Sequence, residues 1–312
     1  DTRMAARFRR EARATARVQH PNVVGIYDTG QLDDGRLFLI MEYVQGKNLL
    51  EIYEDEGPLP MARALPIFLQ IADALAAAHE LGILHRDLKP DNIVLSPTAA
   101  NGSEMVKILD FGLAKMLDDP ETEHLTLPGE VFGTPQYMSP EQCMGEPLTL
   151  ASDVWSFGAL AYEALTGEPP FMANSLLEFV LAQKNRKVPP ASESAPHGGV
   201  PPEIDQLIAD CLKPEPGARI PDGRSLRARL KEISSILAHR AAGSPPDIHH
   251  RTPTSSWLAV DEQTNHEEMQ CMMHERLWEQ LQRVVQLLRR QGLFPAGLGP
   301  KMAHADALAD EI

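Results

Sequence analysis

The spacing of apolar residues divides the first part of the chain into a helix, two strands and a long buried helix. Four apolar residues recur at helical spacing near the beginning: Met4, Phe8, Ala12 and Ala16. Two strand-like runs follow at 23–27 and 36–44, with a turn at 33–35 between them. The stretch 60–81 is almost continuously apolar in its middle, which predicts a buried helix.

The character of the chain changes after Gly46, where helical patterns come to dominate. Two short strand-like runs at 93–95 and 106–109 still enclose a polar loop. The stretch 112–140 has no clear periodicity, and loops of that length usually serve a function. Helical patterns resume in the following segments: 151–166, 174–184, 202–212 and 223–238.

Beyond residue 240 the pattern changes again. Residues 241–262 are rich in Pro, Ser and Thr and are interpreted as a linker, 263–292 as an amphipathic helix and 293–312 as a disordered tail. The helix carries an apolar stripe that resembles a coiled-coil seam: Met273, Leu277, Leu281, Val284 and Leu288. This stripe predicts self-association or docking on a partner.

Charge and cysteine content exclude some classes of function. The net charge is −15, from 29 basic and 44 acidic side chains, which argues against a nucleic-acid binder. Cys143, Cys211 and Cys271 are far apart and form no CxxC spacing, so a reducing, cytoplasmic location is the simple interpretation. Cys271 and His274 share a helix face, but two ligands do not make a metal site. We expect no membrane segment in this chain, because no apolar run approaches the required length.

The strongest chemical signal is a set of three motifs in a fixed order: His85-Arg86-Asp87-Leu88-Lys89-Pro90-Asp91-Asn92, then Asp110-Phe111-Gly112, then Ser139-Pro140-Glu141. The first two match the catalytic loop and the metal-binding segment of protein kinases, and the third lies downstream of them in the expected order. Over about residues 1–238 the sequence resembles the bacterial, eukaryotic-like (Hanks-type) protein Ser/Thr kinases. The resemblance implies an α+β, bilobal protein-kinase-like fold. A partial N-lobe of helix, strands and hinge would occupy 1–46, and a complete, mainly helical C-lobe would occupy 47–240.

The chemistry that this motif would perform follows from its residue types. Phosphoryl transfer needs positioning and neutralisation of charge on the phosphates. Asp87 is the candidate to accept the proton of the substrate hydroxyl. Asn92 and Asp110 offer the hard oxygen ligands that Mg²⁺ prefers, and Lys89 can reach the γ-phosphate of ATP as a point charge. The alternative is that Asp87 and Asp110 merely cap loops.

The resemblance also places the adenine of ATP. The segment 39–46 resembles the strand and hinge that bind the purine, with backbone groups near Glu42 and Val44 as its partners. Met41 would be the gatekeeper at the back of the pocket, and Val94 would lie beneath the ring. An ordinary buried strand would show the same apolar alternation, so this alternative stays open.

Further residues receive roles from the resemblance alone. Glu11 would be the glutamate of the αC helix, whose partner in the family is a strand lysine that grips the α- and β-phosphates; the alternative is a solvated helical charge. Thr134 would bond the catalytic Asp and Lys, which favours Ser/Thr over Tyr as acceptor. Arg86 would receive a phosphate from the activation loop, with Thr122 and Thr126 as the candidate acceptors.

Three scaffold residues also match the family. Asp153 is expected to accept hydrogen bonds from the backbone of the catalytic loop. Glu141 and Arg219 are expected to form a buried bidentate ion pair.

The proposed activity has two rivals. The chain starts at Asp1 and has no preceding Gly-rich loop or strand lysine, so we expect it to begin inside a longer reading frame and, as given, to transfer phosphate poorly. A protein kinase acting on protein substrates in signal transduction is the first reading. A non-catalytic pseudokinase scaffold is the second, and a small-molecule phosphotransferase is the third. The third is disfavoured by Thr134 and by the Ser139-Pro140-Glu141 segment.

Overall fold

The computed structural model describes residues 8, 10, 12–32, 34–97, 104–111, 135–173, 176–185 and 187–243. The strands are β1 (Ile26–Gln31), β2 (Leu37–Met41), β3 (Lys47–Asn48), β4 (Ile93–Pro97) and β5 (Glu104–Ile108). The α-helices are α2 (Leu49–Glu56), α3 (Met61–Glu80), α4 (Pro140–Cys143), α5 (Leu150–Thr166), α6 (Leu176–Asn185), α7 (Ala191–Ser194), α8 (Pro202–Cys211) and α9 (Gly223–Gly243). Short 3₁₀ turns are η1 (Pro90–Asn92), η3 (Pro135–Tyr137) and η4 (Pro216–Ala218).

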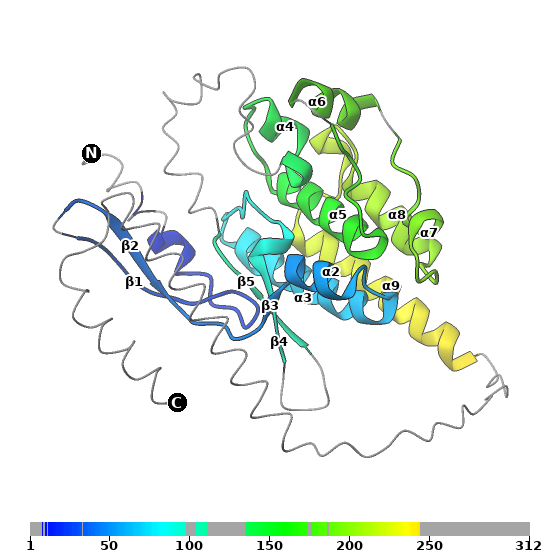
Figure 1. Cartoon of the computed structure of the whole chain (residues 1–312), viewed down its shortest axis with the longest axis horizontal. Helices are drawn as coiled ribbons and strands as arrows, with labels where there is room; N and C mark the ends of the chain where they lie inside the picture. The colour runs from blue at the N-terminus through cyan, green and yellow to red at the C-terminus, as the bar shows by residue number, and fades with distance from the viewer. Residues whose placement is uncertain are drawn as a thin grey trace, which may run out of the picture. The chain divides into compact units, whose positions relative to one another are not determined.

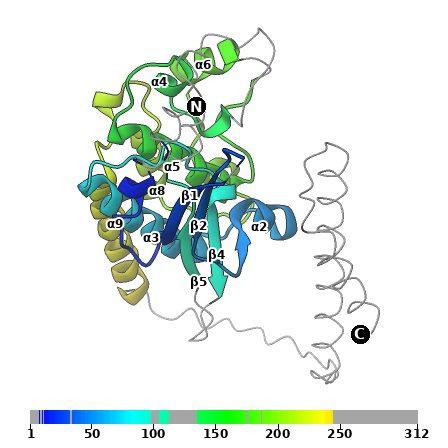
Figure 2. The ribbon, with the colours of Figure 1, turned by 90° about the vertical axis from the view of Figure 1, so that its left-hand side faces the viewer.

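The strands form two antiparallel sheets. One is the β1–β2 hairpin, and the other has the order β3-β4-β5. In Figure 1 the hairpin lies apart from the labelled helices, with β3, β4 and β5 between them. Figure 2 shows the hairpin facing the viewer. This division into a small sheet region and a large helical region agrees with the α+β, bilobal fold that the motifs imply.

The first strand begins later than the apolar pattern predicts. Instead of a strand over 23–27, the structure has β1 from Ile26, and Val23 forms only an isolated bridge with Ile108. The amide of Val24 donates to the carbonyl of Ile108 at 3.0 Å, which holds this segment against β5. Val23 and Val24 are apolar because they are buried there, and not because they pair within the hairpin. The second strand is likewise shorter than the expected 36–44.

The helical core is built around α3 and α5. Helix α3 packs against α9, α5 and β5, and α5 packs against α8. Every residue from Ala151 to Leu165 on α5 is buried, including the polar Ser152, Asp153, Ser156 and Glu163. Gly158 allows the close approach of α8, because a Cβ atom there would lie 2.6 Å from the Cβ of Cys211. Helix α9 continues to Gly243, past the C-lobe boundary expected at 240.

Helix α3 is long and apolar enough to cross a membrane by length and composition alone. Its buried residues contact the core on several sides, however, and include Phe68, which meets Phe157 of α5 edge to face at 5.7 Å between ring centroids. Among the described residues, α3 is the one helix that passes this test. Its hydrophobicity is accounted for by its place in the centre of the helical core.

Candidate active site

The catalytic loop runs between α3 and β4, and its backbone is hydrogen-bonded to Asp153. Its carboxylate, buried on α5, accepts hydrogen bonds from the amide of His85 at 2.7 Å and from the amide of Arg86 at 2.8 Å. Arg86 has a φ of 66°, a left-handed conformation that a non-glycine residue adopts only when its surroundings hold it there. The expected role of Asp153 is therefore confirmed.

His79 completes this support, although the sequence pattern does not single it out. Its Nδ1 accepts the amide hydrogen of Gly223 at 2.9 Å, so its Nε2 carries the proton and donates to Asp153 at 2.9 Å. Burial disfavours the Asp153 carboxylate, but the hydrogen bonds from His79 and the loop outweigh it and lower the pKa of Asp153. The carboxylate thus stays charged beneath the loop and joins α3, α5, α9 and the loop.

Asp87, Lys89 and Asn92 come together at the open side of the loop. The side-chain amide of Asn92 donates to the Asp87 carbonyl at 2.7 Å and to its Oδ2 at 3.2 Å. The Lys89 ammonium lies 3.2 Å from the same Oδ2. The side chains of Asp87 and Lys89 are 27% and 25% exposed, so both remain accessible to a substrate. A carboxylate and an ammonium are thus adjacent where the motif predicts a base and a phosphate-binding cation.

His85 ties the base to the metal-binding segment. Its Nδ1 accepts from the amide of Asp87 at 3.3 Å, and its Nε2 donates to the carbonyl of Leu109 at 2.9 Å. Burial lowers the pKa of His85, consistent with a neutral ring that has one donor and one acceptor nitrogen. The ring also contacts Phe111, with centroids 4.6 Å apart. The positions of Asp87 and Asp110 are therefore linked through one buried imidazole.

Asn92 and Asp110 are brought together by the β4–β5 pair. The amide of Leu109 donates to the carbonyl of Asn92 at 2.9 Å, and Asp110 follows with a φ of 50°. Since the Asn92 side-chain nitrogen donates to Asp87, its Oδ1 is the atom suited to a cation, and Asp110 is exposed. Within the described ranges no group of three or more His, Cys, Asp or Glu residues could hold a metal. Two hard oxygen donors nevertheless fit Mg²⁺, which keeps water or phosphate oxygens as its other ligands.

The predicted adenine segment, residues 39–46, begins in the last residues of β2. Met41 lines a small cavity with residues from the helical segment, both sheets and the Asp110 segment: Thr15, Val24, Ile26, Leu39, Ile108, Asp110 and Phe111. The side chain of Met41 is also 36% exposed, and its role as gatekeeper stays a prediction. Val94 is buried on β4, and Gly46 closes the segment with no room for a side chain, because a Cβ atom there would lie 2.1 Å from the Leu95 carbonyl oxygen.

The side chain of Glu42 has a partner that the sequence pattern does not indicate. Its carboxylate forms an ion pair with Lys107 of β5, with 2.7 Å between Nζ and Oε1. Its amide donates to the carbonyl of Gly25 at 2.8 Å. The backbone role expected for Glu42 and Val44 leaves this side chain free for a structural task.

Several predicted residues lie outside the described residues: Glu11, Thr122, Thr126, Thr134 and the helix expected over 263–292. The helical segment next to Glu11 does reach the site, because Thr15 Oγ1 donates to the Phe111 carbonyl at 3.3 Å. The roles that the resemblance gives to these undescribed residues therefore remain predictions.

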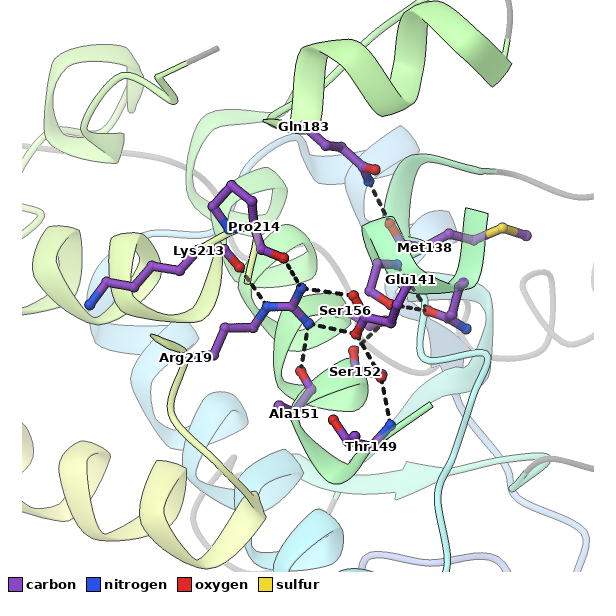
Figure 3. A network of polar contacts seen from close by, with 12 residues as sticks. Met138, Glu141, Thr149, Ala151, Ser152, Ser156, Gln183, Lys213, Pro214 and Arg219 are labelled. Atoms are coloured by element: carbon purple, nitrogen blue, oxygen red, sulfur yellow. Dashed lines mark hydrogen bonds and ion pairs between the residues drawn. The ribbon is translucent and has the colours of Figure 1, made fainter. Parts of the chain in front are cut away.

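The Glu141–Arg219 ion pair is confirmed (Figure 3). Arg219 Nη1 lies 2.7 Å from Glu141 Oε1 and Nη2 lies 2.8 Å from Oε2, with side-chain exposures of 0% and 3%. The other guanidinium hydrogens reach the carbonyl oxygens of Lys213, Pro214 and Ala151. Burial opposes the Glu141 charge, but Arg219 and the Ser152 hydroxyl outweigh it and lower the pKa of Glu141. A fully hydrogen-bonded charge pair of this kind resists distortion.

Gln142, next to Glu141, connects the buried ion pair to the catalytic loop through hydrogen bonds. Its Nε2 donates to the carbonyl of Arg86 at 2.7 Å, and its Oε1 accepts from the amide of Ser139 at 2.9 Å. His79, Lys107 and Gln142 are thus functional neighbours that the motifs do not reveal. Two weak signals exist in the sequence: Gln142 directly follows the Ser-Pro-Glu motif, and His79 interrupts the alanine-rich face of a buried helix.

Comparison with known proteins gives a consistent result. Residues 1–238 match the family described as protein kinase domain. The chain is 40% identical over 234 residues to the serine/threonine-protein kinase pkn3 of Myxococcus xanthus, covering 75% of this chain and 43% of that protein. It is 38% identical over 244 residues to the serine/threonine-protein kinase PknB of Mycobacterium leprae, covering 77% and 37%. The chain therefore spans about two fifths of the length of these curated relatives. Neither the relatives nor the geometry supports the non-catalytic alternative.

Proposed function

Because the chain belongs to the protein kinase domain family, we propose that it transfers the γ-phosphate of ATP to serine and threonine hydroxyls of protein substrates. The observation that carries the proposal is the contact of Asp87 with both Lys89 and Asn92 at the open side of the catalytic loop. This arrangement is supported by hydrogen bonds from buried groups, among them Asp153 and His85.

Each residue has a distinct task in this proposal. Asp87 accepts the proton of the acceptor hydroxyl as its oxygen attacks the γ-phosphorus, and the bond from that phosphorus to the β–γ bridging oxygen breaks. Lys89 holds the transferred phosphoryl group through its charge. Asn92 orients the Asp87 carboxylate through its amide hydrogen, which keeps the acceptor atom of the base at a defined place.

We further propose Asn92 Oδ1 and the Asp110 carboxylate as the ligands of Mg²⁺. When bound, the cation would neutralise phosphate charge. Two observations support this assignment. Both groups are hard oxygen donors, and Asp110 directly follows Leu109, whose amide donates to the carbonyl of Asn92.

The test is phosphoryl transfer from radiolabelled ATP to peptide libraries that carry Ser, Thr or Tyr as the single acceptor, with purified full-length protein. We expect transfer to the Ser and Thr libraries only. Asp87→Asn should reduce the rate by about 10²–10⁴-fold, the usual contribution of a positioned base, while ADP binding persists. Asp55→Asn, an exposed change on α2, is the matched control and should leave the rate unchanged. Transfer by the Asp87→Asn protein at the parent rate would refute the assignment of the base.

We propose regulation by autophosphorylation at Thr122, Thr126 or both. A phosphate near the catalytic loop could form charge-assisted hydrogen bonds with Arg86, whose backbone is fixed from both sides by Asp153 and Gln142. Peptide mass spectrometry after incubation with ATP should detect the modification. The finding of both threonines unmodified in an active protein would exclude it.

Two further proposals concern context. The apolar stripe of residues 263–292 supports self-association, which sedimentation of full-length protein with and without this segment can test. Cys143 and Cys211 are free cysteines, and the wide spacing of the cysteines along the chain supports a reducing, cytoplasmic location. Thiol labelling of protein inside intact cells would show both groups reduced if this is correct.

A further inference from the structure

The proposed adenine segment has a charged connection to the C-lobe that purine binding does not itself require. Lys107 Nζ lies 2.7 Å from Glu42 Oε1 and donates a hydrogen bond of 2.8 Å to Oε2. The same Oε2 accepts from the amide of Gly25 at 3.2 Å, and the Glu42 amide donates to the Gly25 carbonyl at 2.8 Å. These contacts use the amide and carboxylate of Glu42, whereas the proposed purine contact uses its backbone carbonyl region.

The position of Lys107 on β5 is the second observation. Lys107 is the direct cross-strand partner of Val94 on β4, the residue expected beneath the purine ring. Directly opposed residues of an antiparallel pair project from the same face of the sheet. Val94 therefore lies beneath the proposed adenine position, and the side chain of Lys107, on the same face of the sheet, extends to Glu42.

This ion pair is more shielded than the ordinary surface pairs of the molecule. The Lys107 and Glu42 side chains are 14% and 31% exposed, whereas those of Lys47 and Asp55 are 58% and 57% exposed. Charge pairs interact more strongly when water is partly excluded, and exposed pairs contribute little. The hydrogen bond from Lys107 also lowers the pKa of Glu42, which keeps the carboxylate charged.

A second route connects the same strand to Glu42. The Ile108 amide donates to the Asn22 carbonyl at 2.8 Å, and the Val24 amide donates to the Ile108 carbonyl at 3.0 Å. Gly25, which follows, contacts Glu42 with both its amide and its carbonyl. Both routes begin on β5, the strand that leads to Asp110.

We propose that Lys107 is a positioning residue for nucleotide binding, which acts through Glu42 to hold the adenine-binding segment at a fixed place over the floor formed by β4 and β5. The proposal rests on the proposed ATP-dependent function. Lys107 does not touch the nucleotide. Its loss should loosen the hinge, so that the purine-binding backbone groups no longer stay at hydrogen-bonding distance from the ring.

The experiment compares full-length parent protein with Lys107→Met, Lys107→Arg, Glu42→Gln and the double variant Lys107→Met/Glu42→Gln. ADP affinity is measured by calorimetry, and KM for ATP and kcat are measured with the peptide assay. We expect Lys107→Met and Glu42→Gln each to weaken ADP binding and raise KM for ATP about fivefold, as the loss of a charged hydrogen bond predicts. The change should fall on KM rather than kcat, Lys107→Arg should stay near the parent, and the double variant should be no worse than the single variants.

Lys213→Met is the matched control, because Lys213 forms an ion pair of similar length, 2.8 Å to Asp210, far along the chain from this site. It should bind ADP like the parent. Unchanged ADP affinity in Lys107→Met and Glu42→Gln, effects that multiply in the double variant, or a rise in kcat would each overturn the positioning role. If one of these outcomes is found while the parent protein binds ADP and transfers phosphate, only this inference has failed. A parent that does neither refutes the proposed function as well. If thermal melting shows that Lys107→Met is unstable, the positioning role is tested by comparing the ADP affinity of Glu42→Gln with that of Lys107→Arg.

Discussion

The two sides of the proposed nucleotide site are built in different ways. The catalytic loop rests on the helical core, where the carboxylates of Asp153 and Glu141 are buried and fully engaged. The β1–β2 hairpin rests on a small cluster of Ala12, Ile26 and Leu39. Several of its large apolar side chains, and those of the segment after it, are exposed: Tyr27, Leu32, Ile40, Met41 and Tyr43.

This contrast shows where the fold places rigidity. The loop that carries the proposed catalytic groups is held by buried, charge-assisted hydrogen bonds, whose geometry is narrow. The groups that would contact the purine are held by a few apolar contacts and by the Lys107–Glu42 pair. Regions with few buried contacts open at lower free energy than the core. Changes in the core should therefore alter stability and catalysis together, while changes in the hairpin should alter mainly nucleotide affinity.

The largest effect is expected from breaking the buried ion pair. Arg219→Leu leaves the Glu141 carboxylate buried without its partner, and such a loss typically costs about 3–5 kcal/mol of unfolding free energy. Urea unfolding followed by circular dichroism measures it. The double change Glu141→Leu/Arg219→Leu removes both charges and should be less destabilising than Arg219→Leu alone. A single variant as stable as the parent would show that the pair contributes little.

A smaller loss is expected at Asp153. Asp153→Asn would place an amide group opposite the backbone amides of His85 and Arg86, and would leave at least one buried donor unsatisfied, at a cost of about 1–3 kcal/mol. Phosphoryl transfer should fall as well, because the loop that carries Asp87 loses a support. Asp55→Asn, an exposed change on α2, serves as the control in both assays. Normal transfer by Asp153→Asn would separate the support from catalysis.

The hairpin should respond locally. Leu39→Ala shortens a partly buried side chain of the small cluster and should cost about 1 kcal/mol, less than a change in the main core. Hydrogen exchange should accelerate in β1 and β2 but not in α3 or α5. Ala substitution of the buried Leu160 on α5 provides the contrast, with faster exchange across the helical core. Equal acceleration in both regions for Leu39→Ala would mean that they unfold as one unit.

Acid should act on the core through the same carboxylates. The folded protein lowers the pKa values of Glu141 and Asp153 below their ordinary values of 4.5 and 3.8. Both groups therefore bind protons more weakly when folded, so their contribution to stability is complete above pH 4.5 and is lost as pH falls through the lower, folded values. The slope of unfolding free energy against pH below 4.5 should be smaller in Glu141→Gln than in the parent. An identical slope would show that Glu141 does not carry this dependence.

Much of the site could be read from the chain alone, because the relevant residues are close in sequence or carry a distinctive chemical pattern. Asp87, Lys89 and Asn92 lie within one short loop, and the structure brings them into contact. The buried helices were equally predictable, since α3 and α5 must contact the core on most of their surface. Local spacing and composition are sufficient for features of this kind.

Only the tertiary structure could decide which distant residues support that loop. His79 meets Gly223 and Asp153, and Lys107 meets Glu42, across separations that no local pattern spans. The same limit explains the misplaced start of β1, because an apolar Val looks alike whether it faces a paired strand or the core beside Ile108. Residue types state what a side chain can bind. The partner it finds depends on how helices and strands pack, and that packing is a property of the whole core.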